Sequence, residues 1–147
     1  MKIAMGSDHA GYPLKGKVAE LIKELGHEVI DLGTHSEESV DYPDFAVKVA
    51  HAVTQGEADL GVLLCGTGLG MSIAANKVRG IRAVTCGDTF SARSSREHND
   101  ANMLCIGARV TGCGLALDIV KAWLEAEFKG GRHARRVQKI ADIEASS

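Results

Sequence analysis

The stretch Leu60-Gly61-Val62-Leu63-Leu64, followed by Cys65-Gly66-Thr67-Gly68-Leu69-Gly70, indicates the fold class of this chain. The first five residues form an apolar run with the length of a buried strand. The glycine-rich segment after them has the composition of a tight turn into a helix. A buried strand that leads through a glycine loop into a helix is typical of parallel α/β sheets.

Apolar runs of strand length alternate with helix-period segments along the rest of the chain. The predicted strands span residues 2–6, 28–31, 60–64, 81–86 and 103–107. The segments between them carry apolar residues at i, i+3, i+4 and i+7, and several end at glycines. The sequence therefore predicts one α/β domain over residues 1–147, a three-layer sandwich with a five-stranded parallel sheet of the Rossmann or flavodoxin-like kind. The expected strand order is 2-1-3-4-5.

The composition is that of an ordinary globular domain. The chain has 147 residues, of which 45% are apolar and 24% charged, and its formal net charge of -2 does not indicate a nucleic-acid surface. The first residues lack a signal-peptide pattern, and no apolar run approaches the roughly 20 residues that span a bilayer. We expect a cytoplasmic protein without membrane association.

Cysteine and histidine spacing gives no sign of a metal site. The four cysteines form no CxxC pair and no zinc pattern, and the six histidines form no HxH or HExxH pattern. No metal is therefore expected. Cys65 differs from the other three cysteines because a glycine loop follows it.

Two chemically rich loops follow the first and third predicted strands. In the expected strand order, a ligand crevice lies between the carboxyl ends of these strands. The loops are Ser7-Asp8-His9-Ala10-Gly11 and Cys65 to Gly70. The glycines of the second loop let successive backbone N–H groups point inward, and the following helix adds its positive end. We expect this loop to hold an oxyanion; the alternative is a tight turn that binds no ligand.

The spacing of the Cys65 loop differs from that of the common phosphate-binding motifs. A Walker loop requires Gly-Lys-Ser/Thr where this chain has Gly70-Met71-Ser72. A dinucleotide fold carries its glycine motif after the first strand, where this chain has Asp8, and a cysteine phosphatase carries an arginine where this chain has Met71. A thiol at a helix N-terminus suits a nucleophile or a general base. The alternative for Cys65 is a buried small side chain at a strand end.

Other candidate residues lie toward the C-terminus. His98-Asn99-Asp100 ends the helix before the fifth strand, at the amino end of the sheet, so His98 would reach the Cys65 loop only from a second subunit. The alternative is a helix C-terminal cation. Arg132 and Arg136 lie at i and i+4 and form, with Arg109, a candidate phosphate clamp, or otherwise an exposed basic face.

The last predicted helix, about residues 133–145, has too few apolar residues to stand alone. Val137 and Ile140 lie on one of its faces. We expect this helix to pack on a neighbouring element, at a dimer interface.

Several ordered motifs, spread over nearly the whole chain, are similar to those of a known family. They are Ser7-Asp8-His9-Ala10-Gly11, Asp41-Tyr42-Pro43-Asp44, Cys65-Gly66-Thr67-Gly68-Leu69-Gly70, Ala74-Ala75-Asn76-Lys77, Gly80-Ile81-Arg82-Ala83, His98-Asn99-Asp100 and Gly130-Gly131-Arg132-His133. The chain resembles the type B ribose-5-phosphate isomerases, a group that also contains galactose-6-phosphate isomerase subunits. The resemblance implies interconversion of ribose 5-phosphate and ribulose 5-phosphate through an enediolate, in the pentose phosphate pathway, without metal or organic cofactor.

The resemblance also implies a role for each site residue. Cys65 would move the proton between C2 and C1, and Thr67 and His98 would assist opening of the furanose ring. The loop amides with Asn99 would stabilise the enediolate, Asp8 would bind sugar hydroxyls, and His9 with the arginines would hold the phosphate. The implied substrate-binding residues are Asp8, His9, Gly66, Gly68, Leu69, Gly70, Asn99, Arg109, Arg132 and Arg136. Family members are dimers or pairs of dimers with sites between subunits, so a homodimer or a dimer of dimers is expected.

Alternative functions stay open at this point. Within the family, the substrate could be a six-carbon aldose phosphate such as allose 6-phosphate or galactose 6-phosphate, because motif spacing does not determine pocket length. Outside the family, the chain could be a non-catalytic flavodoxin-like or receiver-like module that binds an anion. A receiver would carry an acidic residue where Cys65 stands, which disfavours this alternative.

Overall fold

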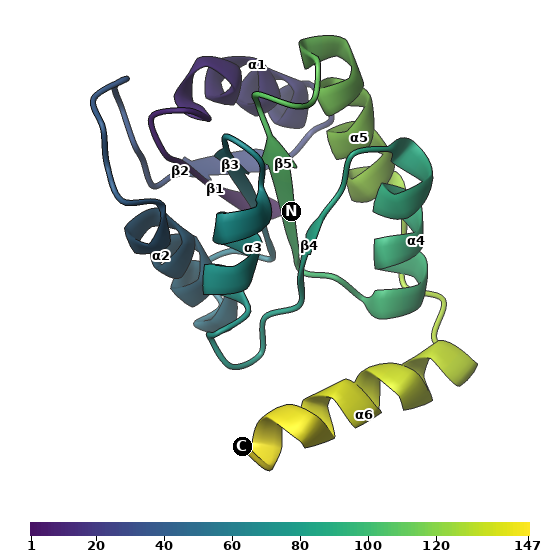
Figure 1. Ribbon diagram of the computed structural model, residues 1–147. Helices are drawn as coiled ribbons and strands as arrows, with labels where there is room; N and C mark the ends of the chain where they lie inside the picture. The colour runs from purple at the N-terminus through teal and green to yellow at the C-terminus, as the bar shows by residue number, and fades with distance from the viewer.

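The computed structural model describes residues 1–147 and contains five strands and six helices. In chain order these are β1 (Lys2–Ser7), α1 (Tyr12–Glu24), β2 (Glu28–Asp31), α2 (Tyr42–Thr54), β3 (Leu60–Cys65), α3 (Leu69–Ala75), β4 (Ala83–Thr85), α4 (Thr89–Asn99), β5 (Met103–Gly107), α5 (Cys113–Glu125) and α6 (Arg132–Ala145). Figure 1 shows the sheet between two layers of helices, with α6 extending away from it. The expected three-layer α/β fold is confirmed.

The strands pair in parallel in the order β2-β1-β3-β5-β4. The predicted order 2-1-3-4-5 is wrong in its last two positions. β5 is buried along its whole length, whereas β4 has three residues and becomes exposed toward Thr85. A strand that is buried on both faces belongs inside a parallel sheet, and a short one is suited to its edge. The predicted strand 81–86 is correspondingly shorter in the structure.

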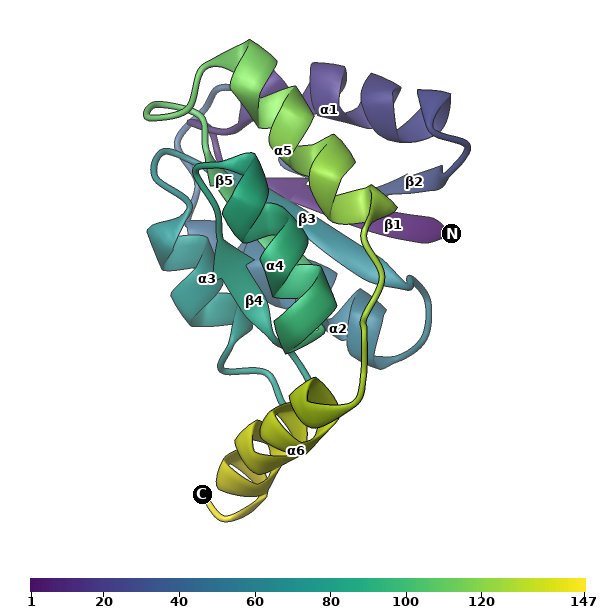
Figure 2. The same ribbon diagram turned by 90° about the vertical axis from the view of Figure 1, so that its right-hand side faces the viewer.

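Changes in winding direction distribute the helices over the two faces of the sheet. Right-handed crossovers place a helix on the opposite face whenever the chain reverses direction, as it does after β2 and again after β4. One buried cluster joins α1, α4 and α5 to the sheet around Trp123, and the other joins α2 and α3 to it around Met71. Figures 1 and 2 show α4 and α5 on the face opposite α2 and α3.

The turns after β1 and β3 touch each other through their backbones. Asp8 N donates a hydrogen bond to Leu64 O at 3.1 Å. A Cβ at Gly11 would lie 2.1 Å from Leu64 O, so only glycine permits this approach. The two loops that the sequence marked as chemically rich are therefore side by side.

A buried lysine of α1 binds the end of β2 and the turn after it, and the backbone of that turn is hydrogen-bonded to the end of β1. Lys15 Nζ donates to Asp31 Oδ1 at 2.9 Å and to Thr34 O, and the Lys15 side chain is 6% exposed. Ser7 N donates to Gly33 O at 2.6 Å, and Thr34 N donates to Ser7 O at 2.8 Å. Burial raises the pKa of Asp31, but the hydrogen bonds from Lys15 and Gly33 lower it more, so the pKa lies below its usual 3.8.

Replacing Asp31→Asn is expected to lower the free energy of unfolding near neutral pH by about 1–2 kcal/mol, because Lys15 loses its buried countercharge. A carboxylate whose folded pKa is depressed contributes stability above its unfolded pKa and loses it as the pH falls through the folded value. The difference between variant and wild type should therefore shrink as the pH is lowered from about 6 to about 3. Urea unfolding across this range is the measurement. The exposed Asp118→Asn is the control, and a difference independent of pH would contradict the prediction.

Candidate active site

Cys65 is the last residue of β3, and the glycine loop that follows folds back over its side chain. The residue is 5% exposed, and Gly68 N donates to its Sγ at 3.0 Å. This hydrogen bond requires the chain to fold back, which Gly68 permits by adopting a left-handed φ of 82° at the start of α3. The backbone N–H groups of Gly66 and Thr67 have no hydrogen-bond partner within the chain. The loop thus presents a thiol beside free amide donors, an arrangement suited to proton transfer next to a developing oxyanion.

Asp8 and His9 lie in the adjoining turn after β1. Asp8 is 7% exposed, and its Oδ1 accepts hydrogen bonds from Ala10 N and Gly11 N, each at 2.9 Å. Its Oδ2 has no donor within the chain and is available to a ligand hydroxyl. His9 Nδ1 accepts from Val40 N at 3.2 Å, which assigns the ring proton to Nε2. The turn therefore offers a ligand one acceptor, Asp8 Oδ2, and one donor, the Nε2–H group of His9.

Arg109 and Tyr42 complete this end of the sheet. Arg109 N donates to Gly66 O at 3.0 Å, and a Cβ at Gly66 would lie 3.4 Å from Arg109 Cδ. A Cβ at Gly70 would lie 2.4 Å from the Tyr42 ring, so the ring packs directly on the loop backbone. Sequence reasoning assigned no role to Tyr42. Its place in the motif Asp41-Tyr42-Pro43-Asp44 was the available signal.

The remaining predicted residues gather at the opposite, amino end of the sheet. His98 and Asn99 lie in the last turn of α4, and Arg132 and Arg136 lie in the first turns of α6. The rings of His98 and His133 stack with centroids 4.3 Å apart, and Lys129 N donates to Glu97 O at 3.0 Å. Within one chain, Arg132 and Arg136 therefore do not join Arg109 in a single clamp.

The groups at the amino end form a cationic patch. The pKa of His133 lies below its usual value because desolvation and the charges of His98, Arg132, Arg136 and Lys129 disfavour its imidazolium form. His133 lies in the motif Gly130-Gly131-Arg132-His133, but the sequence did not predict it as a site residue. The patch has the charge needed to attract an anion, but Cys65 lies at the other end of the sheet.

Two of the other cysteines are poor candidates for chemistry. Burial, together with the nearby Asp88 charge, raises the pKa of Cys86 to about 11. Burial likewise raises the pKa of the fully enclosed Cys105 far above its usual value. No group of His, Cys, Asp or Glu side chains is arranged to hold a metal ion, and no helix is long and apolar enough to cross a membrane.

Comparison with known proteins gives matches over nearly the whole chain. The family model described as Ribose/Galactose Isomerase matches residues 3–140. Ribose-5-phosphate isomerase B of Escherichia coli is 55% identical over 143 residues, covering 97% of this chain and 96% of the relative. D-erythrulose-4-phosphate isomerase of Pectobacterium atrosepticum is 46% identical over 145 residues, covering 98% and 95%.

The solved structures agree with these matches. The structure of ribose-5-phosphate isomerase B from Clostridium thermocellum superposes with a TM-score of 0.97 and 64% identity, covering 99% of each chain. The resemblance inferred from the motifs is confirmed. Because sequence and structure match over nearly the full length, this chain belongs to the ribose/galactose isomerase family.

Proposed function

We propose that this protein interconverts ribose 5-phosphate and ribulose 5-phosphate through an enediolate, with Cys65 as the base. The observation that carries the proposal is the loop geometry: the Cys65 thiol lies beside the free N–H groups of Gly66 and Thr67 and next to the Asp8 turn. Relatives that match almost full length and carry the name ribose-5-phosphate isomerase B support the choice of substrate.

The proposed reaction moves two protons and needs no external electron carrier. Cys65 removes the C2 proton and returns it to C1, while the hydroxyl proton of O2 passes to O1, so the aldose becomes the ketose. The N–H groups of Gly66 and Thr67, with the backbone of Gly68, Leu69 and Gly70, stabilise negative charge on the enediolate oxygens, and one such donor contributes about 3–4 kcal/mol. Asp8 Oδ2 receives a sugar hydroxyl. The free, buried cysteines favour a reducing, cytoplasmic compartment.

The proposed site is completed by a second copy of the chain. Ribose 5-phosphate is mostly a closed furanose, so its ring must open before C2 can be deprotonated. In the proposal His98 of a second copy gives a proton to the ring oxygen with help from Thr67. Asn99 of that copy faces the enediolate, and its Arg132 and Arg136 hold the phosphate together with His9 and Arg109.

Exposed apolar side chains support this homodimer. No residue of α6 is buried, and Ile143 is 70% exposed. Near the Cys65 loop, Leu69 and Ile73 on α3 and Phe90 on α4 are at least 58% exposed. Large apolar side chains grouped in this way mark association surfaces. The proposal therefore places both α6 and the neighbourhood of the loop at the interface.

A second candidate substrate is the four-carbon D-erythrulose 4-phosphate, favoured by the relative of that name. The same enediolate chemistry applies to it, but the furanose ring does not, because its C4 oxygen carries the phosphate. A kcat/KM for this tetrose pair above that for ribose 5-phosphate would favour the second candidate. Allose 6-phosphate and galactose 6-phosphate belong in the same comparison.

Replacing Cys65→Ala is expected to lower kcat on ribose 5-phosphate by about 10³-fold, the usual size of a lost general base. The measurement is conversion to ribulose 5-phosphate, together with exchange of the C2 proton in D₂O. Cys113→Ala, at the start of α5, is the matched control and should keep its activity. Exchange at the wild-type rate in the Cys65→Ala protein would show that another group is the base.

Mixing Cys65→Ala protein with His98→Asn protein is expected to restore activity. If each site takes Cys65 from one copy and His98 from the other, a mixed dimer contains one intact site and one doubly altered site. Random re-association of equal amounts then gives about one quarter of the wild-type activity. The measurement is ribose 5-phosphate turnover after dissociation and re-association of the mixture. Activity no higher than the mean of the two parent variants would mean that both residues act within one chain.

A further inference from the structure

Asp100 has an unusual backbone conformation immediately after His98 and Asn99. It is the only non-glycine residue with a positive φ, at 48°, with ψ at 44°. Aspartate tolerates this left-handed region better than most residues, but it is uncommon there. Asp100 ends α4 by donating its N–H to Ser95 O. The chain therefore turns sharply at the residue that follows the proposed site residues.

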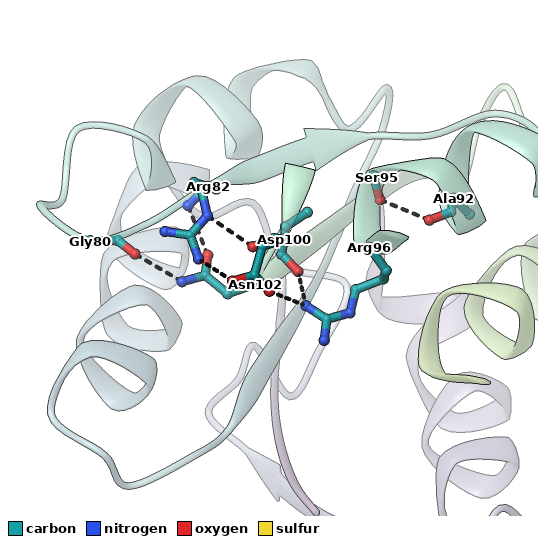
Figure 3. Close-up of polar contacts among 8 residues, drawn as sticks. Gly80, Arg82, Ala92, Ser95, Arg96, Asp100 and Asn102 are labelled. Carbon is teal, nitrogen blue, oxygen red and sulfur yellow. Dashed lines mark hydrogen bonds and ion pairs between the residues drawn. The ribbon is translucent and has the colours of Figure 1, made fainter. Parts of the chain in front are cut away.

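Two arginines hold this turn (Figure 3): Arg82 in the loop before β4, and Arg96 on α4. Arg82 Nε donates to Asp100 O at 2.8 Å, and its Nη2 lies 3.4 Å from Asp100 Oδ2. Arg96 Nη1 lies 3.4 Å from Asp100 Oδ1 and also donates to Ala101 O. Each carboxylate oxygen thus faces its own guanidinium group. We call Arg82, Arg96 and Asp100 the Asp100 clamp.

Further bonds connect the clamp to the loop before β4. Asn102 Oδ1 accepts from Arg82 N at 2.7 Å, and Asn102 Nδ2 donates to Gly80 O at 2.8 Å. Gly80 N in turn donates to both carboxylate oxygens of Glu144 on α6, each at 3.1 Å. The turn after His98 and the end of α6 are therefore both fastened to the segment Gly80–Arg82.

Stability alone is a weak explanation for this arrangement. The Arg96 side chain is 14% exposed, and its Nε is buried without a hydrogen-bond partner. Burial lowers the pKa of Arg96, Asp100 raises it, and the nearby Arg82 lowers it again, so two like charges are brought close in a partly desolvated place. Partly buried ion groups of this kind contribute little net stability and are better suited to fixing a geometry.

We propose that the Asp100 clamp is a positioning device for His98, setting the turn that presents the imidazole to the ring oxygen of a sugar in the partner copy. The proposal rests on the proposed function. Within one chain, the hydrogen bonds of the three clamp residues stay at the turn after α4, away from the Cys65 loop, and in the proposal they act through His98. The clamp also gives a role to the motif Gly80-Ile81-Arg82-Ala83, which the catalytic assignments leave unused.

The test separates ring opening from proton transfer. Ribose 5-phosphate requires ring opening, whereas ribulose 5-phosphate is acyclic because its C5 oxygen carries the phosphate. Uptake of deuterium at C1 of ribulose 5-phosphate in D₂O therefore requires Cys65 but no ring-opening acid. The ratio of the ribose 5-phosphate conversion rate to this exchange rate measures the contribution of His98.

Asp100→Asn keeps the size of the side chain and its tolerance of the left-handed region but removes the charge. In this variant kcat on ribose 5-phosphate is expected to fall about tenfold, because even a small displacement of the His98 imidazole slows the step that it assists. The C1 exchange rate should change less than about twofold. His98→Asn should show the same split, and Asp118→Asn, an exposed acid on α5, should show none. Arg82→Lys, which cannot make both Asp100 contacts, is a second clamp variant with the same expectation.

A fall in the ratio for both clamp variants supports the proposal. A parallel fall of both rates would mean that the clamp does not act on His98 selectively, and unchanged rates would mean that His98 needs no positioning; either result overturns the proposal. Wild-type protein without activity on ribose 5-phosphate would instead refute the proposed function. An unchanged ratio in His98→Asn would refute the ring-opening role of His98 and, with it, the positioning role of the clamp.

Discussion

The loop after β3 passes within contact distance of the end of β5, and this close approach determines what surrounds Cys65. A Cβ at Gly107 would lie 2.5 Å from the carbonyl carbon of Thr67, and a Cβ at Gly68 would lie 3.2 Å from Gly107 N. Ala108 N donates to Cys65 O at 2.8 Å. Glycine at both positions allows the two backbones to touch, so the loop is held by main-chain contacts and its free N–H groups keep a fixed direction.

The strand order determines which side chains lie beside the Cys65 loop. Because β5 and not β4 lies beside β3, the turn after β5 lies against the Cys65 loop, and this turn carries Arg109. In the order 2-1-3-4-5, the turn containing Asp88 would have occupied that position and placed a carboxylate near the proposed enediolate. The observed order thus places a cation near an anionic ligand, and it explains why Arg109 belongs with the loop rather than with Arg132 and Arg136.

The sequence predicted those features that depend on local pattern. Strand and helix alternation follows from hydrophobic periodicity, and the Cys65 loop is recognisable by its glycines and its position after an apolar strand. The order of β4 and β5 was not predictable in this way, because both segments are apolar and their neighbours are set by long-range pairing. The contact of Lys15 with Asp31, and that of Tyr42 with Gly70, likewise join residues distant in sequence, and nothing in the local pattern of α1 marks Lys15 as buried.

The carboxyl end of the sheet presents neutral N–H donors and the amino end presents charged side chains, and the proposed isomerisation can use both kinds of group. At the carboxyl end, the donors around Cys65 are mostly neutral N–H groups, which in the proposed reaction stabilise charge that appears only as the proton leaves C2. At the amino end, Arg132 and Arg136 carry full charges, which the proposal assigns to a phosphate dianion that is present throughout. Arg109, the cation beside the loop, is assigned in the proposal to the phosphate rather than to the enediolate. In the proposed dimer a second copy brings the cationic end to this loop, and the Asp100 clamp sets the position of His98 there.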